Sequence, residues 1–476
     1  MTPVARRTKI PNHTLEQLLA ESGMSAHALA RRVNELCLAA GHEVAYTHTS
    51  VVNWTRRGMT PRAPAPVCIA AALAERLGRP VSPAEIGMGK ARTNAERVGL
   101  DFARDTADAV RNATAFWSTV EHPDRRRFLT GAFAISAYTT PVTRWLGVPA
   151  DTDAGHQGGR QVGHADLAEL WRAADEAQRW DSKYGGGSWR SSSVTDCLAR
   201  RATPLLHGSY SDDIGRSLFS VTAELNRVAG WSAVDTGHHD LAQRHFIQAL
   251  RMAKAGANVE IGCHVLTNMA LQALLRDYHD EAIDMAQGAY DRSRSRAAHR
   301  VLGFTKLVEA RAHAKAGDAR AAAAALTAAE HRLERAEPGL DEPPWIGYFT
   351  HARLAADAVE VHRDLRNPAA AWRWNAQATA MSPHDYTRSV GLRLTVLATT
   401  HLQQGDLDQG LRLGHRSVDT LSRVASARAR DYLHHVTTAL TPWHKEPRVR
   451  EFLHRARTEF APVPAGRRPG PGHAAV

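Results

Sequence analysis

The chain of 476 residues has few cysteines and no long apolar run. Its four cysteines lie far apart and form no Cys-x-x-Cys pair, which argues against a disulfide framework or a zinc ribbon and favours a reducing compartment. Because no run of 18 apolar residues occurs, we expect no membrane-spanning helix, no membrane partner and a cytoplasmic location. The apolar content of 43% still leaves enough material for two or three buried cores.

Motifs of catalysis and nucleotide binding are also missing. His42-Glu43 is followed by Val-Ala-Tyr rather than by a second zinc-binding histidine, and no Gly-x-Ser-x-Gly elbow occurs. The cluster Tyr184-Gly-Gly-Gly-Ser188 lacks the Gly-Lys-Ser/Thr ending of a phosphate loop. The pairs His238-His239 and His434-His435 have no third ligand at a suitable spacing. We therefore predict no enzyme activity, no cofactor and no metal site.

Positive charge predominates, with a formal net charge of +11 at pH 7. Such a balance suits an acidic partner, although charge alone does not identify it. Near the N-terminus no acidic residue lies between Glu43 and Glu75, whereas Arg56, Arg57 and Arg62 fall in that interval. This local excess of positive charge indicates a segment that binds a polyanion.

Residues 50–61, Ser-Val-Val-Asn-Trp-Thr-Arg-Arg-Gly-Met-Thr-Pro, predict a short helix with two different faces. Val51 and Trp54 are three residues apart and share an apolar face. Gly58 supplies a helix C-cap, and Pro61 follows where a stopped helix expects it. The polar and basic side chains on the other edge are Ser50, Asn53, Arg56 and Arg57.

A helix that is anchored by tryptophan and that offers asparagine and arginine fits the major groove of double-stranded DNA. This groove admits one helix, and its base edges and phosphates match these side chains. The alternative is a small surface helix with a solvated basic face. The basic bias of the flanking sequence favours DNA binding.

Further helix signals surround this segment. Thr14-Leu-Glu-Gln17 is a capping box that opens a first helix, which ends at Gly23. Ser25 can cap a second helix. The second helix is indicated by the helical spacing of Leu29, Val33 and Leu36. A fourth helix, which ends at Gly78, is indicated by Ile69, Leu73 and Leu77. Ser82-Pro-Ala-Glu85 opens a fifth. Five short helices predict a compact all-α domain over residues 10–90.

Residues 14–88 resemble a helix-turn-helix domain of the phage Cro/C1 repressor class. The family ending Trp-x-x-Gly-x-x-Pro is matched by Trp54, Gly58 and Pro61, with one extra residue before the glycine. Another departure is the segment Ala40–Thr49 between helices two and three, where the family has a tight turn. The resemblance implies that Thr49, Ser50 and Asn53 face bases, and that Arg56, Arg57 and Arg62 hold phosphates.

A second feature begins with the sequence Ala229-Gly-Trp-Ser-Ala-Val-Asp-Thr-Gly237. Its small residues let a neighbouring helix approach, Gly237 turns the chain, and Phe246 fills the space between two helices. This pattern resembles a tetratricopeptide repeat. Small residues after the turn recur at Ala242, Ala282, Ala322, Ala370 and Gly410.

Three of the four intervals between these small residues are 40 residues, and the fourth is 48. The longer interval holds Pro338 to Pro344, which predicts an insertion in one connection between helices. Gly317-Asp318 and Gly405-Asp406 repeat the turn at Gly237-His238. Alanine-rich runs could produce a false period, but the phased turns favour a true repeat. We therefore predict an α-solenoid of tetratricopeptide-like helical hairpins over residues 166–460.

Stacked hairpins form a concave groove that suits a peptide or a protein segment. Following the repeat convention, the residues predicted to line this groove are Glu224, Arg227, Trp231, Asp235, His264 and Asn268. The alternative is that each is a structural residue packed against a neighbouring helix. Between the two features we expect a helical connector at residues 91–146 and a linker or long loop at residues 147–165. Residues 461–476 are predicted to be a disordered tail.

The combination resembles a group of actinobacterial transcriptional regulators. The resemblance rests on the N-terminal domain, on Arg179-Trp-Asp-Ser-Lys-Tyr-Gly-Gly-Gly187 and on the first repeat, Ala229–Gly237. It implies a cytoplasmic regulator of transcription, in a group that controls development and antibiotic production. Because repeat proteins of this kind also self-associate, we expect a homodimer, which would fit a two-half-site operator. The alternative from another class is an adaptor protein that uses the repeat groove and does not read DNA sequence. The lengthened connection between helices two and three supports this alternative.

Overall fold

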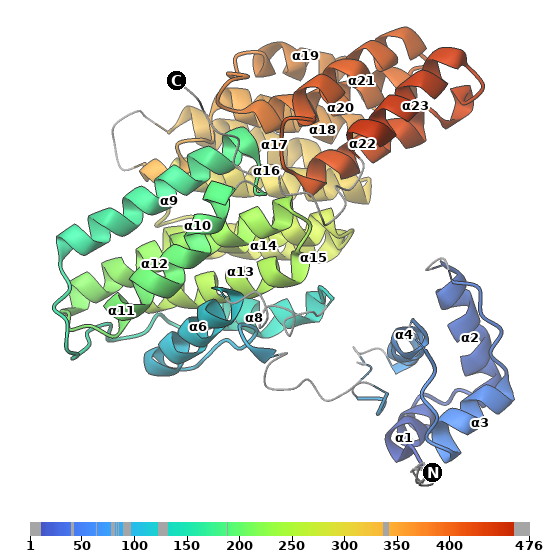
Figure 1. Cartoon of the computed structure of the whole chain (residues 1–476), viewed down its shortest axis with the longest axis horizontal. Helices are drawn as coiled ribbons and strands as arrows, with labels where there is room; N and C mark the ends of the chain where they lie inside the picture. Colours follow the sequence, from blue (N-terminus) through green and yellow to red (C-terminus); the bar gives the residue numbers. More distant parts are fainter. Residues whose placement is uncertain are drawn as a thin grey trace, which may run out of the picture. The chain divides into compact units, whose positions relative to one another are not determined.

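The computed structural model describes residues 11–39, 42–62, 64–77, 81, 83, 85–88, 97–121, 132–187, 189–336 and 342–460. Within these ranges the regular secondary structure is helical, apart from two isolated β-bridges. The chain divides into two compact units, Met1–Arg97 and Val98–Val476. The prediction of an all-α protein is confirmed, and Figure 1 shows its helices in successive pairs.

The first unit contains α1 (His13–Glu21), α2 (Ala26–Ala39), α3 (His48–Arg56) and α4 (Ala65–Leu77). The apolar sides of these helices meet in one core, which includes Leu15, Leu29, Val33, Val51, Trp54, Ile69 and Leu73. None of these side chains is more than 3% exposed. The helical spacing in the sequence therefore identified the core of this unit correctly.

The ends of these helices confirm one predicted cap and correct another. The backbone N–H of Ala28 donates to Ser25 Oγ at 3.2 Å, as expected for a cap of α2. The capping box at Thr14 is wrong, because α1 begins one residue earlier and Leu15 N donates to Asn12 Oδ1 at 3.0 Å. Asn12 is the stronger anchor because its amide also donates to Ile86 O at 2.8 Å. Gly78, Ser82 and Ala84 lie outside the described residues.

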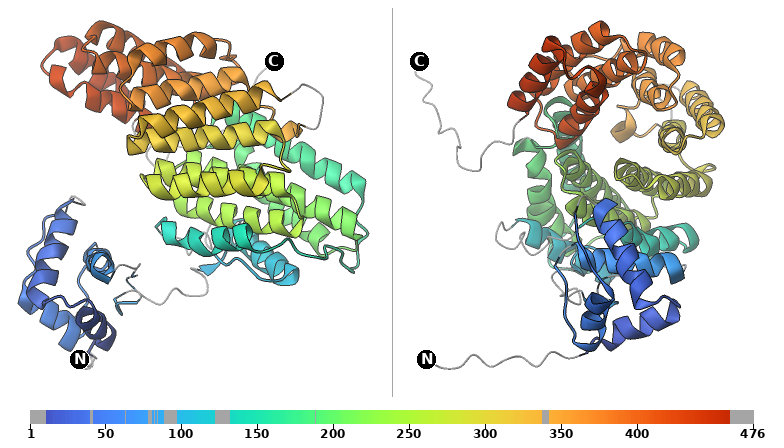
Figure 2. Two further views of the ribbon diagram at one scale, coloured as in Figure 1. Left: turned by 180° about the vertical axis from the view of Figure 1, so that it is seen from behind. Right: turned by 90° about the vertical axis from the view of Figure 1, so that its right-hand side faces the viewer.

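The second unit opens with α6 (Thr106–Glu121), η2 (Ile135–Tyr138), α8 (Thr139–Gly147), α9 (His164–Tyr184), α10 (Trp189–Cys197), η3 (Leu198–Ala202) and α11 (Thr203–Leu206). Five hairpins follow: α12 (Asp212–Asp235) with α13 (His239–Ala255), α14 (Val259–Leu275) with α15 (His279–Ser293), α16 (His299–Ala316) with α17 (Ala319–Glu334), α18 (His351–Asp364) with α19 (Pro368–Ala378), and α20 (Thr387–Gln403) with α21 (Leu407–Leu421). The unit ends with α22 (Ala427–Ala439), η5 (Thr441–Trp443) and α23 (Pro447–Glu459). Figure 2 shows the hairpins following one another through the unit.

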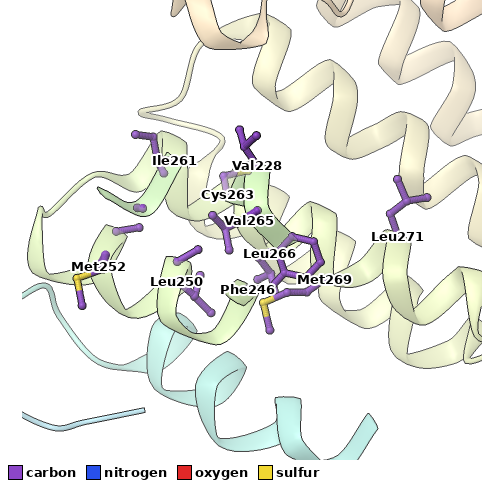
Figure 3. Packing of buried hydrophobic residues seen from close by; sticks show 14 of the residues in the cluster. Val228, Phe246, Leu250, Met252, Ile261, Cys263, Val265, Leu266, Met269 and Leu271 are labelled. Carbon is purple, nitrogen blue, oxygen red and sulfur yellow. The ribbon is translucent and has the colours of Figure 1, made fainter. Parts of the chain in front are cut away.

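The predicted repeat register is confirmed in every hairpin. The small residues Ala242, Ala282, Ala322, Ala370 and Gly410 all lie near the start of the second helix of a hairpin, and all are buried. A small side chain at this point lets the two helices approach closely. In the first hairpin a Cβ atom on Gly230 would lie 2.6 Å from the ring of Phe246, which is fully buried. Figure 3 shows Phe246 among the apolar side chains of this core.

The turns inside the hairpins share one backbone form. Gly237, Gly317 and Gly405 have φ values of 82°, 84° and 82°, a region that glycine enters without a steric penalty. Asp277 and Arg366 take the equivalent place in the other two hairpins, with φ values of 64° and 53°. The sequence showed the turn signal only where glycine is present.

The 48-residue interval, from Ala322 to Ala370, is explained by an insertion between two hairpins, as predicted. Helix α17 ends at Glu334 and α18 begins at His351, and η4 (Pro344–Ile346) lies between them. Ile346 and Phe349 are fully buried, so this connection packs back onto the hairpins.

Helices α6 and α8, which the sequence assigned to a separate connector, belong to the second unit. Trp117 of α6 is 1% exposed, and its indole N–H donates to Asn226 Oδ1 at 2.9 Å. Trp145 of α8 lies against Gly262, where an added Cβ would come within 2.5 Å of its Nε1 atom. Both tryptophans therefore fix these helices on the first two hairpins.

The segment between α8 and α9 is a loop fastened to the second unit. Asp151 accepts hydrogen bonds from Arg251 Nη2 at 2.7 Å and Lys254 Nζ at 2.5 Å. Ala154 and Val162 are each 2% exposed. The sequence predicted either a linker or a long loop at residues 147–165, and the structure has a long loop there. None of the helices in the described ranges combines the length and hydropathy that crossing a bilayer requires.

Candidate functional sites

The inner side of α3 is held by apolar packing and by backbone hydrogen bonds. Val51 and Trp54 are 1% and 3% exposed. The ring of Tyr46 meets Trp54 edge-on, with 5.0 Å between the ring centroids. The backbone N–H of Asn12 donates to Thr55 O at 2.7 Å and so ties the end of α3 to the start of α1. These contacts fix α3 as a rigid rod on the first unit.

The connection from α2 to α3 is long but anchored. The amide of Asn34 on α2 donates to Tyr46 O at 2.9 Å and accepts from Tyr46 N at 2.9 Å. This pair of hydrogen bonds replaces a tight turn as the device that sets the start of α3. Residues 40 and 41 of the connection lie outside the described residues.

The outer side of α3 carries a row of polar side chains. Thr49, Asn53 and Arg56 are spaced four and three residues apart and therefore share one face. Thr49 and Arg56 are exposed, and Asn53 is half-buried. Within the described residues, none of these three side chains has a hydrogen-bonding or ionic partner. The described part of the chain therefore leaves their side-chain donors and acceptors unused.

The remaining predicted contact residues lie around this row. Arg57 and Arg62 are exposed and form no ion pair with any described residue. Ser50 is half-buried, and its hydroxyl oxygen accepts the backbone N–H of Thr47 at 3.1 Å. Ser50 therefore has a capping role in α3, while its hydroxyl proton remains available. Gly58 ends the helix with a φ of 55°, as predicted.

The residues predicted to line the repeat groove lie inside the second unit. Glu224, Arg227, Asp235, His264 and Asn268 are at most 3% exposed, and Trp231 is half-buried. All six point to partners in the same chain. Packing contacts therefore hold them within the second unit, while Arg227, Trp231 and Asn268 also line a hollow of about 50 Å³.

Arg227 and Glu224 form a buried ion pair on α12. Arg227 Nε and Nη2 donate to the two carboxylate oxygens of Glu224 at 2.8 and 2.6 Å, and Nη2 also donates to Gln178 Oε1 at 2.6 Å. Gln178 lies on α9, so the pair links this helix to the first hairpin.

His264, on α14 of the second hairpin, contacts the insertion that precedes α18. Its ring stacks on Trp345 with 5.1 Å between centroids, and its Nε2 atom lies 3.0 Å from the Tyr348 hydroxyl. Asn268 Nδ2 donates to His264 O at 2.7 Å. Burial and the charge of Arg227 hold the pKa of His264 well below its usual range, so the ring is neutral at pH 7.

Asp235 is a buried junction between the first and last parts of the second unit. Its oxygens accept from Gly186 N at 2.9 Å and from Ser426 Oγ at 2.9 Å. Arg388 Nη1 and Arg428 Nε lie 2.9 and 3.2 Å from its carboxylate. Although burial by itself raises the pKa of Asp235, the two guanidinium charges lower it, so the side chain is ionised. One carboxylate thus joins α12 to α20, α22 and the turn after α9.

The two sequence motifs of the second unit meet at this junction. Asp181, in the first motif, binds Arg388 at 2.7 Å, and Trp231, in the second, lies 4.9 Å below the Arg428 guanidinium. The turn Gly185–Gly187 fits tightly beside them. A Cβ on Gly186 would lie 2.5 Å from Ser232 O, and one on Gly187 would lie 2.9 Å from Ala425 O. Glycine is therefore required for the close approach of these backbones.

A second buried cluster surrounds Glu360 on α18. Its carboxylate accepts from Arg311 Nη2 and from the Tyr432 hydroxyl, each at 2.8 Å, and Arg363 Nη2 lies 3.3 Å away. Burial opposes ionisation, but the charges of Arg311 and Arg363 prevail and lower the pKa of Glu360 to about 2.

Sequence reasoning missed the partners that complete these clusters, chiefly Asp181, Arg311, Glu360, Arg388 and Arg428. Asp181 lay in a motif that was noticed, but the arginines carried no local signal because their partners are far away in sequence. Within the described residues, no three His, Cys, Asp or Glu side chains gather in a way that could hold a metal ion.

Comparison with known proteins adds one match. A family model described as the SP15 N-terminal domain matches residues 15–89. The match covers most of the first unit, including α3 and its connection to α2. No curated protein is significantly similar to the chain.

Proposed function

We propose that the protein is a cytoplasmic transcriptional regulator that binds double-stranded DNA through α3. The repeat unit would bind a peptide, a protein partner or a second protomer. The resemblance to actinobacterial regulators supports a role in development or secondary metabolism.

One observation carries this proposal. Helix α3 is fixed by Val51 and Trp54 on one side. On the other side Thr49, Asn53 and Arg56 have no side-chain partner among the described residues. Asparagine and arginine are the side chains that bind adenine and guanine edges in the major groove. A rigid helix also holds these groups in place before binding, so little ordering is needed.

The surrounding charge fits the same partner. Arg57 and Arg62 extend the basic surface beyond the end of α3, and neither is neutralised by a described carboxylate. Such side chains bind phosphates, which position a domain without selecting a sequence.

A homodimer would give this unit its specificity. Two copies of α3 on a two-fold axis would read half-sites about 34–36 Å apart, one turn of DNA. The repeat unit, as the larger part of the chain, would set the spacing between the copies.

Selection from a pool of randomised duplexes by the purified full-length chain tests this proposal. We expect one enriched sequence with two half-sites and an affinity that falls steeply with salt. Recovery of a pool without sequence preference would contradict it.

The alternative function is an adaptor whose first unit no longer reads DNA. The long connection between α2 and α3 favours this alternative, because it departs from the tight turn of the resembled family. Affinity capture from a cell extract, with and without nuclease, separates the two. An adaptor keeps its main partner after nuclease treatment, whereas a DNA-binding regulator loses the proteins that it captured through DNA.

A further inference from the structure

Three hollows inside the second unit meet at one side chain, Arg428 of α22. The outer hollow has a volume of about 320 Å³ and is lined by the ends of α14, α16 and α18 and by α22. Two inner hollows have volumes of about 50 and 30 Å³. Arg428 lines all three.

Arg428 is only partly satisfied by its own chain. It is 8% exposed, and its Nε atom lies 3.2 Å from Asp235, while its face covers Trp231. Its two Nη atoms have no hydrogen-bonding partner among the described residues. Burial lowers the pKa of Arg428, and the charges of Arg388 and Arg353 add to this effect against the opposing charge of Asp235. The positive charge at this point is thus incompletely compensated.

The smallest hollow has an excess of positive charge. Its lining includes Arg311, Arg353, Arg393 and Arg428 but only two carboxylates, Asp357 and Glu360. Both carboxylates are already used. Asp357 accepts from Arg353 Nε at 2.7 Å, and Glu360 is bound by Arg311 at 2.8 Å.

Arg393 supplies the unmatched charge. It is 9% exposed, and its Nη1 atom donates to Asn375 Oδ1 at 2.8 Å. No described carboxylate pairs with it, and its buried Nε atom has no hydrogen bond. The Nε atom of Arg388, beside the other inner hollow, is buried and has no hydrogen bond either. Buried donors without acceptors are costly, so their presence around an open space indicates that an acceptor is missing.

We propose that these hollows bind a small ligand through its anionic group, a carboxylate or a phosphate, held by Arg428 and Arg393. The two inner hollows are large enough for a compact anionic group, since a single water needs a space of only about 10–15 Å³. The outer hollow holds the rest of the ligand and reaches the surface beside the exposed residues Arg276 and His434.

The outer hollow also restricts the ligand. Its lining carries charges of both signs, with Arg276, Lys315 and three histidines beside the carboxylates of Asp277 and Asp431. The other two carboxylates in this lining are occupied, since Glu360 binds Arg311 and Asp364 binds Arg363. A polar body with hydrogen-bonding groups therefore fits better than an apolar one. The anionic group can belong either to a free metabolite or to the carboxy terminus of a peptide.

Binding at this position acts on the junction at Asp235. An anion on Arg428 supplies an acceptor to the side chain that links α22 to α12, and so stabilises the contact between these two helices. The role of the ligand as an effector of DNA binding rests on the proposed function, whereas the binding site itself does not.

Calorimetric titration of the full-length chain at constant ionic strength tests the site. The probes are inorganic phosphate, acetate, and tetra-alanine with either a free or an amidated carboxy terminus. We expect saturable binding of at least one free anion and a rise in the melting temperature with its concentration. Binding of the free peptide but not the amide identifies a peptide terminus, whereas binding of phosphate or acetate alone identifies a free anion.

Variants locate the binding. Arg428→Gln and Arg393→Gln should each weaken it by about tenfold or more, whereas Arg455→Gln, at a paired surface arginine, should not. If Arg428→Gln fails to fold by circular dichroism, Arg393→Gln decides alone. Absence of saturable binding, or undiminished binding in a folded variant, overturns the site. If the wild-type protein shows no sequence-selective DNA binding, the proposed function is overturned, but the anion site is not.

Discussion

Two groups of arginines, one in each unit, occupy opposite environments. In the first unit Arg56, Arg57 and Arg62 lie exposed around α3, and no described residue forms an ion pair with them. In the second unit Arg227 and Arg388 are only 3% and 4% exposed, and each forms an ion pair with a carboxylate of its own chain. The same side chain is therefore available to a partner in one unit and part of the internal structure in the other.

This difference separates binding surfaces from structural clusters. A buried charge must be compensated, because removing it from water is costly. An exposed charge costs little when it is unpaired, and so it can be kept for an external ligand. Positive charge in the sequence is thus an ambiguous signal until burial is known.

The strongest test of the comparison is to remove the central buried carboxylate. Asp235→Ala leaves Arg388 and Arg428 without compensation, and should lower the free energy of unfolding of the second unit by about 3–5 kcal/mol. Urea unfolding followed by circular dichroism measures the change. The matched control is Asp408→Ala, which removes an exposed partner of Arg448 and should change stability little. Equal effects of both variants would contradict the structural role of the buried cluster.

A smaller loss is expected at the close backbone approach of the turn after α9 to α12. The Cβ of Gly186→Ala would lie 2.5 Å from Ser232 O, so the turn after α9 must move away from α12. We expect a loss of about 1–3 kcal/mol, typical of overpacking. Gly159→Ala is the control, because its added Cβ meets nothing within 4 Å. Unchanged thermal stability of Gly186→Ala would show that the turn is not tightly packed.

The buried clusters should also make stability depend on pH. His264 has a lowered pKa in the folded state, so between that pKa and about 6.5 the unfolded state binds more protons. The free energy of unfolding should therefore fall as the pH drops below about 6.5. A second loss should follow below about pH 4.5, as Glu360 approaches its folded pKa of about 2. In urea titrations His264→Gln should flatten the first phase, and an identical profile would contradict this assignment.

The smallest effect on stability is expected in the first unit. Arg57→Ala removes an exposed side chain without a described partner, so the melting temperature should stay the same. Its loss should instead weaken binding to the selected duplex and reduce the slope of log affinity against log salt by about one. Arg76→Ala, on the exposed side of α4, is the control. A change in stability without a change in salt slope would assign Arg57 to the fold rather than to DNA.

Much of the fold was predictable because its signals are local. Val51 and Trp54 marked the buried face of α3 by their spacing, and Gly237, Gly317 and Gly405 marked the turns of the repeat. The turns at Asp277 and Arg366 have the same backbone form but carried no signal, since these residue types are common elsewhere.

The inner clusters were not predictable because they depend on distant contacts. Asp235 was expected to face a ligand, but its partners come from residues about 50 positions earlier and more than 150 later in the sequence. A repeat convention places a side chain on the inner face of a solenoid. It does not show whether other helices of the same chain occupy that space, as α9 and α22 do here.

The most direct test of the central claim, that α3 reads DNA, is fluorescence anisotropy of the full-length chain on the selected duplex. The measurement compares wild type with the double variant Asn53→Ala and Arg56→Ala. As control, Gln17→Ala with Arg76→Ala also removes one amide and one guanidinium group, from exposed sites on α1 and α4. We predict that the α3 variant loses its preference for the selected sequence while the control keeps it. Equal affinity and selectivity of all three proteins would contradict the account.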